Sequence, residues 1–317
     1  MRNFFELPFN AKAMFVSSFV IMLLLCYLNC DIWSTRMDYT FGYLTPFFVA
    51  YVVFDRKENI FAYFNGEPIF EGSKLLSILC TLFFVFMLVC SILITLLFAS
   101  AFFLTGQRGG PIFGTTFGAV WLCLSMAYFS SAYNCSGKKM SVVQRLNYTA
   151  LFIFPCFIWL IATPLFGAGE ELVSLALLSI VSETTFYVLD NFGFLVELRG
   201  NTISFPNGSV GVADACSGIR SLTACLFAGS FLAAVFLDKF WKKFSLVVCS
   251  MFLAFFNNIL RALFLSIWAY NYGSDSISGF VHDAAGYVVL GLTVIGLFIL
   301  IPIFMINPIP PEFRNQK

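Results

Sequence analysis

A series of apolar runs extends along this chain, each close to the length that crosses a lipid bilayer. A transmembrane helix needs about 20 apolar residues. Only 11% of the 317 residues are charged, whereas a soluble domain carries about 25%. The chain is therefore predicted to be an all-α polytopic membrane protein with about eight transmembrane helices. The predicted helices cover residues 13–29, 40–54, 75–104, 112–133, 148–166, 215–236, 245–270 and 284–306.

The basic residues predict how these helices are oriented. Every second connection is basic, whereas the opposite connections hold only Arg36, Arg108 and Arg199. The basic connections contain Arg2, Lys12, Arg56, Lys57, Lys74, Lys138, Lys139, Arg145, Lys239, Lys242, Lys243, Arg314 and Lys317. Because Lys and Arg accumulate in cytoplasmic loops, both termini are predicted to be cytoplasmic. No small-residue cleavage site follows the first run, which is therefore interpreted as an uncleaved span of the cytoplasmic (inner) membrane.

One long outward connection, residues 167–214, is predicted to form a small extracytoplasmic cap. Its first part mixes polar and apolar residues too evenly for a span, so we expect a helix lying against the outer membrane surface. Its second part alternates apolar and polar residues around two turn dipeptides, Gly200-Asn201 and Asn207-Gly208. This pattern predicts two or three very short strands.

Composition argues against several classes of function. The net charge is +1, and no basic stripe with stacking aromatic residues indicates a nucleic-acid partner. Most of the ten cysteines lie inside apolar runs, where cysteine ordinarily behaves as a small hydrophobic residue. The chain has one histidine and no Cys-x-x-Cys pair. We therefore expect no zinc site, no disulfide framework and no cofactor.

Three polar residues stand out because the predicted topology brings all of them to the outer interface. Cys216 lies at the outward end of the sixth predicted span, Arg261 in the outer half of the seventh, and His282 just before the eighth. An arginine inside a span costs at least about 2.5 kcal/mol and indicates a functional site by default. A thiol, a guanidinium and an imidazole are the components of a cysteine nucleophile site, which is what these residues predict.

Each component has a chemical role. A thiolate is the nucleophile, and thiols ionise more readily at helix amino termini and beside cations. The backbone N–H groups of Ser217 and Gly218, which follow Cys216, could hold a developing oxyanion. His282 can exchange a proton at working pH. Arg261 cannot lose its proton and would act as a fixed positive charge.

Three neighbouring residues are candidates for supporting roles. Asp214 is interpreted either as a helix cap or as a catalytic group. Arg220, one turn after Cys216, either supports the site or extends to lipid head groups. Asn258, one turn before Arg261, lies on the same helix face and is expected to orient the guanidinium.

The combination resembles the exosortase/archaeosortase family of membrane cysteine transpeptidases. The resemblance is carried by ACSGIRS at 215–221, by NILR at 258–261 and by the following His282. The lead-in GNTISFPNGSVGVAD at 200–214 also looks like the family's segment before its cysteine. At Asp214 the family is associated with Glu, so this chain keeps the acid on a shorter side chain.

The resemblance implies both an organisation and an activity. It covers about residues 200–290, the expected catalytic core of a single membrane-embedded domain over 1–317. Cys216 would be the nucleophile, Arg261 the electrostatic stabiliser and His282 the acid/base. Exosortases are thought to cleave a carboxy-terminal sorting signal of secreted proteins, which comprises a short motif (often Pro-Glu-Pro), a transmembrane segment and a basic cluster. They would pass the new terminus to an envelope lipid or polysaccharide acceptor, with the active site facing outward among membrane lipids.

Two other classes of protein are consistent with these residues. In a transporter or channel, Arg261, Asp214 and His282 would line a polar pathway, and the thiol of Cys216 would be dispensable. A non-enzymatic scaffold for envelope polysaccharide assembly would tolerate single changes at the three candidate catalytic residues.

Overall fold

The structure is a computed structural model that describes residues 4–69, 74–164, 167–206, 208–212 and 219–305. The chain packs into two compact units, Met1–Gly167 and Ala168–Lys317. This division concerns packing alone, so a single functional domain over 1–317 stays a prediction.

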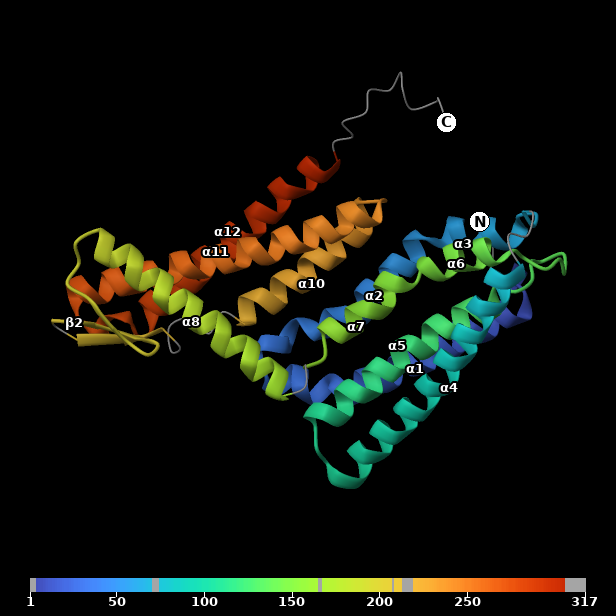
Figure 1. The fold of residues 1–317 in the computed structure, drawn as a ribbon, viewed down its shortest axis with the longest axis horizontal. Coiled ribbons are helices and arrows are strands. Elements are labelled where there is room, and N and C mark those ends of the chain that lie inside the picture. Colours follow the sequence, from blue (N-terminus) through green and yellow to red (C-terminus); the bar gives the residue numbers. More distant parts are fainter. Residues whose placement is uncertain (1–3, 70–73, 165–166, 207, 213–218, 306–317) are drawn as a thin grey trace, which may run out of the picture. The chain divides into compact units, whose positions relative to one another are not determined.

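The first unit consists of helices that run back and forth (Figure 1). They are the 3-10 helix η1 (Phe4–Glu6), α1 (Phe9–Thr35), the 3-10 helix η2 (Met37–Leu44), α2 (Thr45–Asp55), α3 (Lys57–Asn65), α4 (Lys74–Thr105), α5 (Gly109–Ser130), α6 (Val142–Ala150) and α7 (Ile153–Ile161). A capping box starts α6: the Gln144 backbone N–H donates to the Ser141 hydroxyl, and the Gln144 side chain accepts from the Ser141 backbone N–H. These bonds satisfy backbone N–H groups that have no partner within the helix.

Contacts between distant residues define the two ends of this unit. At one end the backbone N–H of Cys135 donates to the carbonyl of Phe64 (2.9 Å), and the Cys135 thiol lies 3.6 Å from the carbonyl of Glu6. The start of α1, the end of α3 and the connection after α5 therefore meet there.

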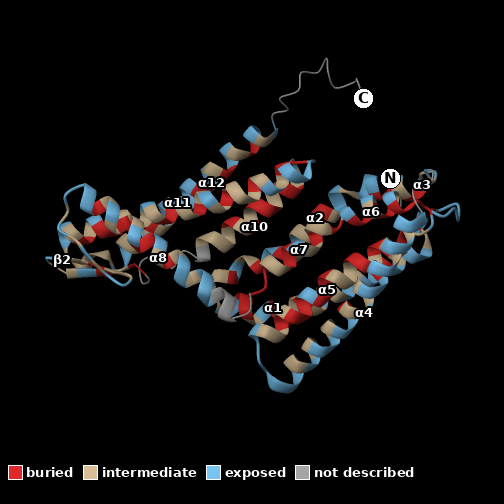
Figure 2. Ribbon diagram, in the orientation of Figure 1, coloured by how far each residue is buried: buried red, intermediate tan, exposed pale blue. Residues whose placement is uncertain are grey.

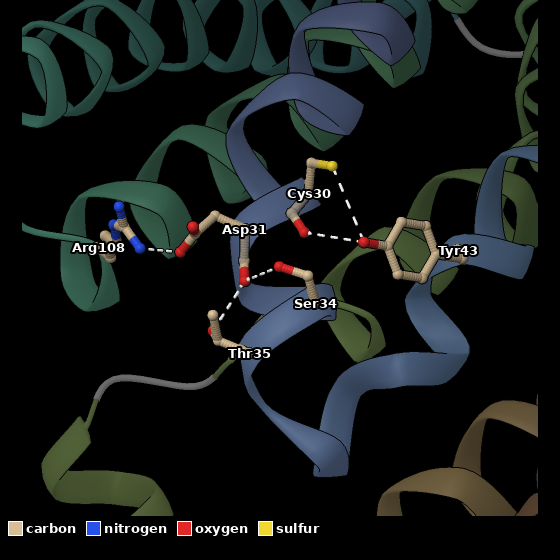
Figure 3. Close-up of polar contacts among 6 residues, drawn as sticks. All are labelled: Cys30, Asp31, Ser34, Thr35, Tyr43 and Arg108. Atoms are coloured by element: carbon tan, nitrogen blue, oxygen red, sulfur yellow. Dashed lines mark hydrogen bonds and ion pairs between the residues drawn. The ribbon is translucent and has the colours of Figure 1, made fainter.

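A polar cluster occupies the opposite end of the first unit (Figure 3). The hydroxyl of Tyr43 donates to the carbonyl of Cys30 (3.3 Å), and Arg108 forms an ion pair with Asp31. The hydroxyl of Thr35 donates to the Asp31 carbonyl (2.8 Å). The end of α1, the end of η2 and the start of α5 are joined by these contacts.

The predicted second span, residues 40–54, crosses between these ends but is not one α-helix. The indole of Trp33 packs directly on Gly42, where a side chain would overlap the ring, and Pro46 lies in the first turn of α2. At ideal geometry the rises of the 8 residues of η2 and the 11 of α2 sum to about 32 Å, against a hydrocarbon core of about 30 Å. The expected helix is thus corrected to a 3-10 segment followed by a short α-helix.

Burial differs sharply between α4 and α5 (Figure 2). Residues along most of α5 are buried, whereas α4 buries only Phe84 and Ser91. The two helices approach closely because Gly118 has no side chain to overlap Thr95. The ring of Phe84 also stacks on Tyr128 with centroids 4.0 Å apart. The outward side of α4 is exposed and apolar, as expected of a helix that faces lipid.

The predicted fold class is confirmed. Within the described ranges, seven helical segments are long and apolar enough to cross a membrane: α1, α4, α5, α6 with α7, most of α8 (Gly167–Asn191), α11 (Phe240–Tyr272) and α12 (Phe280–Met305). The predicted sixth span is shorter in the described part, where α10 runs from Ile219 to Phe236.

The predicted helix in the first part of the cap is present as α8, and its place on the outer membrane surface stays a prediction. Residues 171–191 of α8 form an unbroken helix with a mean hydropathy of 1.8 over its most apolar window. Its few carboxylates, which include Glu171, Glu183 and Asp190, are too widely spaced to make a continuous polar face. By length and composition alone it could also cross a membrane, but a ninth crossing would place the two termini on opposite sides, against the distribution of Lys and Arg.

The predicted strands of the cap are confirmed. Strands β1 (Glu197–Arg199), β2 (Thr202–Phe205) and β3 (Gly208–Gly211) form an antiparallel sheet in the order β1-β2-β3. The first turn contains Gly200, whose φ of +61° belongs to the left-handed region that favours glycine. Of the second predicted turn dipeptide, Asn207 lies outside the described residues.

The sheet is held against the helices of the second unit by a shared hydrophobic core. Ile203 and Val210 of the sheet are buried with Leu178 of α8, Ala262 of α11 and Ala285 of α12. The 3-10 helix η3 (Ser274–Ile277) connects α11 to α12. This core joins the cap directly to the helices that carry the candidate site.

Candidate functional site

The candidate site is built around a hydrogen bond between α11 and α12. The Nη2 atom of Arg261 lies 3.0 Å from the Nε2 atom of His282. Because a guanidinium can only donate, Nε2 must be the acceptor, and the imidazole in this arrangement is neutral. Two of the three predicted catalytic residues are therefore in direct contact.

The other nitrogen of the imidazole faces a carboxylate. Since Nε2 accepts from Arg261, the proton of the neutral ring lies on Nδ1, which is 3.4 Å from Oδ1 of Asp283. The side chains of His282 and Asp283 are 37% and 69% exposed. Asp283 can thus favour the tautomer that presents Nε2 to the guanidinium.

The guanidinium also has an unused donor. Its Nε atom is buried and has no hydrogen-bond partner among the described residues. A buried donor without a partner costs about 1–3 kcal/mol. Such a group is a candidate binding point for an anion at this site.

Two glycines of α12 face α11 and show how the two helices are paired. Gly286 packs against the guanidinium of Arg261, and further along the pair Leu253 covers Gly296. Residues later in α12 therefore meet residues earlier in α11, which makes the helices antiparallel. This register brings the third residue of α12, His282, to Arg261.

A second polar bond connects the same two helices one turn before Arg261. The side-chain amide of Asn257 donates to the hydroxyl of Thr293 (2.8 Å), which in turn donates to the carbonyl of Val289 (2.8 Å). Asn257 and Thr293 are both buried. Their bond holds the register that aligns the candidate site.

We expect a measurable coupling between Asn257 and Thr293 in helix pairing. A double-mutant cycle of Asn257→Ala and Thr293→Val should give about 0.6 kcal/mol, the average for buried hydrogen bonds between transmembrane helices. The free energy of unfolding, measured by detergent titration from bicelles, checks this value. Asn271→Ala is the matched control, because exposed Asn271 bonds only within α11. A coupling of zero would show that the Asn257–Thr293 hydrogen bond does not contribute to the pairing of the two helices.

Of the remaining predicted site residues, two lie in described helices and four lie outside the described residues. Asn258 is buried on α11, but no hydrogen bond joins it to Arg261, whose described partner is His282. Arg220 is the second residue of α10. The other predicted residues lie outside the described residues; they are Cys216, Asp214, Ser217 and Gly218.

The segment that contains Cys216 joins two elements of the second unit. Before it, Val212 is buried in the same core as Ala262 and Ala285, the neighbours of Arg261 and Gly286. After it, Ile219 begins α10, which packs against α11 and α12. The backbone N–H of Val212 also donates to the carbonyl of Asn201 (3.0 Å).

Sequence reasoning missed four residues that shape the site: Asp283, Gly286, Asn257 and Thr293. A signal existed for Asn257, because an Asn-Asn pair inside an apolar helix is as unusual as the arginine that follows it. No pattern along the chain pointed to Gly286 or Thr293, whose roles depend on the partner helix. Within the described residues, no cluster of His, Cys, Asp and Glu could hold a metal ion.

Fold and site together define a polytopic membrane protein with a guanidinium–imidazole pair between two antiparallel helices. The model of the transmembrane exosortase family matches residues 33–299, which is most of the chain and includes both Arg261 and His282. The chain belongs to the transmembrane exosortase family. No curated protein gives a significant match, and neither does any solved structure.

Proposed function

We propose that this exosortase is a cysteine transpeptidase of the cytoplasmic (inner) membrane. Its substrates are secreted proteins with a carboxy-terminal sorting signal, and its acceptor is a lipid or polysaccharide of the envelope. The single observation that carries the proposal is the 3.0 Å contact of Arg261 with His282. A base and a fixed cation from separate helices meet there, as a cysteine nucleophile requires.

The first step is proton transfer from the thiol of Cys216 to Nε2 of His282. An imidazole that is protonated at Nε2 can no longer accept from Arg261, so the hydrogen bond between them breaks. The guanidinium donor is then free for the negative charge that develops in the reaction. Proton uptake by His282 and exposure of the cation are thus one event.

The thiolate next attacks the scissile carbonyl carbon. A sulfur–carbon bond forms and the carbonyl oxygen becomes an oxyanion, for which the freed Nη2 and the unpaired Nε–H of Arg261 are suitable donors. As the oxyanion collapses, the carbon–nitrogen bond breaks and the leaving amine takes the proton from His282. The product is a thioester on Cys216.

Transfer to the acceptor reverses these roles. An acceptor amine or hydroxyl gives its proton to His282 and attacks the thioester carbonyl. The sulfur–carbon bond then breaks, and the departing thiolate takes the proton back from His282. Restricted access of water at a membrane site would favour transfer over hydrolysis. In the proposed topology, with both termini cytoplasmic, the site faces outward, where the sorting motif of a membrane-anchored substrate would lie.

The test is processing of a secreted reporter that ends in a candidate sorting signal of the native host. The reporter is co-expressed with the wild-type enzyme or with Arg261→Gln at equal membrane abundance, and its mass is measured. We expect cleavage by the wild type and a loss of at least about 10²-fold with the variant, the effect of removing an oxyanion donor. The mass of the new terminus distinguishes transfer from hydrolysis.

Equal cleavage by wild type and Arg261→Gln would contradict the mechanism. If a reporter shown by crosslinking to contact the enzyme is never cleaved, the transpeptidase proposal fails. A transporter would instead show changed transport selectivity with Arg261→Gln.

Substitutions at Gly286 are expected to have graded effects on reporter cleavage. A Cβ atom at this position would lie 3.6 Å from Nη2 of Arg261, an ordinary contact, so Gly286→Ala should retain activity within about twofold. Gly286→Leu should displace the guanidinium and lower the rate by at least about tenfold, because misplacement of a catalytic group by 1 Å can cost 10²-fold. Gly291→Leu is the control, since a Cβ atom there meets nothing within 4 Å. Equal rates for both leucine variants would show that close packing at Gly286 does not position Arg261.

A further inference from the structure

The first unit contains a large apolar cavity that the proposed reaction does not use. Its volume is about 540 Å³, within the range of 300–1,000 Å³ that is typical of small-molecule sites. Residues of α1, α2, α3, α5 and α7 line it, and most of their side chains are aliphatic or aromatic. The others are Met14, Met22, Cys123, Cys156, Ser18 and Lys57. A cavity of this composition suits a hydrocarbon ligand.

The cavity is elongated along α1. The lining residues of this helix extend from Met14 to Leu25, which is about 16 Å of helix rise, and Leu7 extends the lining before the helix begins. Trp159 of α7 lines the cavity together with Leu25. One leaflet of a bilayer has a hydrocarbon thickness of about 15 Å. The cavity therefore has the length of a single lipid chain rather than the shape of a compact ligand.

One charged residue lines the cavity, and it lies at the end near Leu7. Lys57 is the first residue of α3, and its ammonium lies 3.9 Å from the centroid of the Phe54 ring. Phe54 and Phe61 also line this end. Within the described residues, Lys57 forms no ion pair with a carboxylate. An anionic head group at this end would meet a cation, whereas the opposite end offers only apolar side chains.

We propose that the cavity binds one acyl chain of an anionic phospholipid, with the phosphate of the head group beside Lys57. The lipid fills the space between α1 on one side and α2 and α7, which contact each other, on the other. This binding site is independent of the proposed transpeptidase activity, because all its lining residues belong to the first unit.

Two adjacent serines provide a matched pair of variants that test whether the cavity binds the acyl chain. Ser18 lines the cavity, whereas Ser17, one position earlier on α1, is exposed and does not line it. Ser18→Phe should fill the cavity, and Ser17→Phe adds the same ring on the outside. Ala50→Leu, on α2, is a second cavity-filling variant for the case that Ser18→Phe is not recovered folded.

The experiment is native mass spectrometry of the full-length protein in detergent after equilibration with dioleoyl phosphatidylglycerol. We expect one retained lipid molecule in the wild type and in Ser17→Phe. Retention should fall at least about tenfold, or 1.4 kcal/mol, in Ser18→Phe or Ala50→Leu. Equal retention in the cavity-filling variants and the control would overturn the proposal.

Three further arms test the head group. Lys57→Gln should lower phosphatidylglycerol retention, whereas Lys139→Gln, an exposed lysine that does not line the cavity, should not. Dioleoyl phosphatidylcholine, with the same chains and no net charge, should be retained less by the wild type. Free glycerol phosphate should not displace the bound lipid. Equal retention of the two lipids, or displacement by glycerol phosphate alone, would contradict a site that requires both the acyl chain and the negative charge of the head group.

Discussion

Cys216→Ala is expected to abolish cleavage of the sorting-signal reporter, with a loss of at least about 10³-fold in rate. Removal of the nucleophile from a covalent mechanism leaves only the contributions of binding and oxyanion stabilisation. The variant should reach the membrane in normal amounts, since a thiol-to-methyl change is small. The measurement is the fraction of reporter converted over time, followed by mass shift at matched enzyme abundance.

Cys249→Ala is the matched control for this experiment. Cys249 is a free, partly buried cysteine of α11, so its loss tests the general effect of removing a thiol. We expect its rate to remain within about twofold of the wild type, because the residue lies outside the proposed site. Equal cleavage by Cys216→Ala and wild type would remove Cys216 from the chemistry and favour a transporter or a scaffold.

His282→Gln is expected to lower the cleavage rate by about 10²–10⁴-fold, the usual contribution of general acid–base catalysis. Glutamine is chosen because its side-chain oxygen can still accept a hydrogen bond from Arg261 but cannot transfer the proton. The substitution therefore separates proton transfer from the positioning of the guanidinium. Single-turnover rates of reporter cleavage, measured in membranes of equal enzyme content, give the loss.

The neighbouring carboxylate provides an internal comparison. Asp283→Asn should cost no more than about tenfold, because Asp283 is 69% exposed and only orients the imidazole from 3.4 Å. Full activity of His282→Gln would show that the imidazole does not transfer the proton. A larger loss in Asp283→Asn than in His282→Gln would transfer the acid/base role to the carboxylate.

The cap illustrates what alternation and turn residues can predict. The strands around Gly200-Asn201 form as expected because the signals that predict them are local. Alternating apolar and polar residues place the apolar side chains on one face of a strand, and Gly200 supplies the positive φ of the turn. The span at 40–54 was harder to predict, because packing of Trp33 on Gly42 favours a 3-10 segment before Pro46 starts the helix. That packing involves a neighbouring helix, so hydropathy does not report it.

Patterns along the chain are sufficient to predict a membrane protein, short strands after residue 196, and the unusual positions of Arg261 and His282. These conclusions depend on run length, turn residues and the cost of charge in a membrane, all of which are properties of short segments.

Which of these groups meet depends on how the helices pack, and no short segment encodes that packing. The contact of Arg261 with His282 depends on the antiparallel register of α11 and α12, in which Leu253 packs on Gly296 and Asn257 bonds to Thr293. The cavity beside Met14 and Trp159 likewise exists only between packed helices. The physical reason is that side-chain packing at close range selects one register among many that are equally apolar.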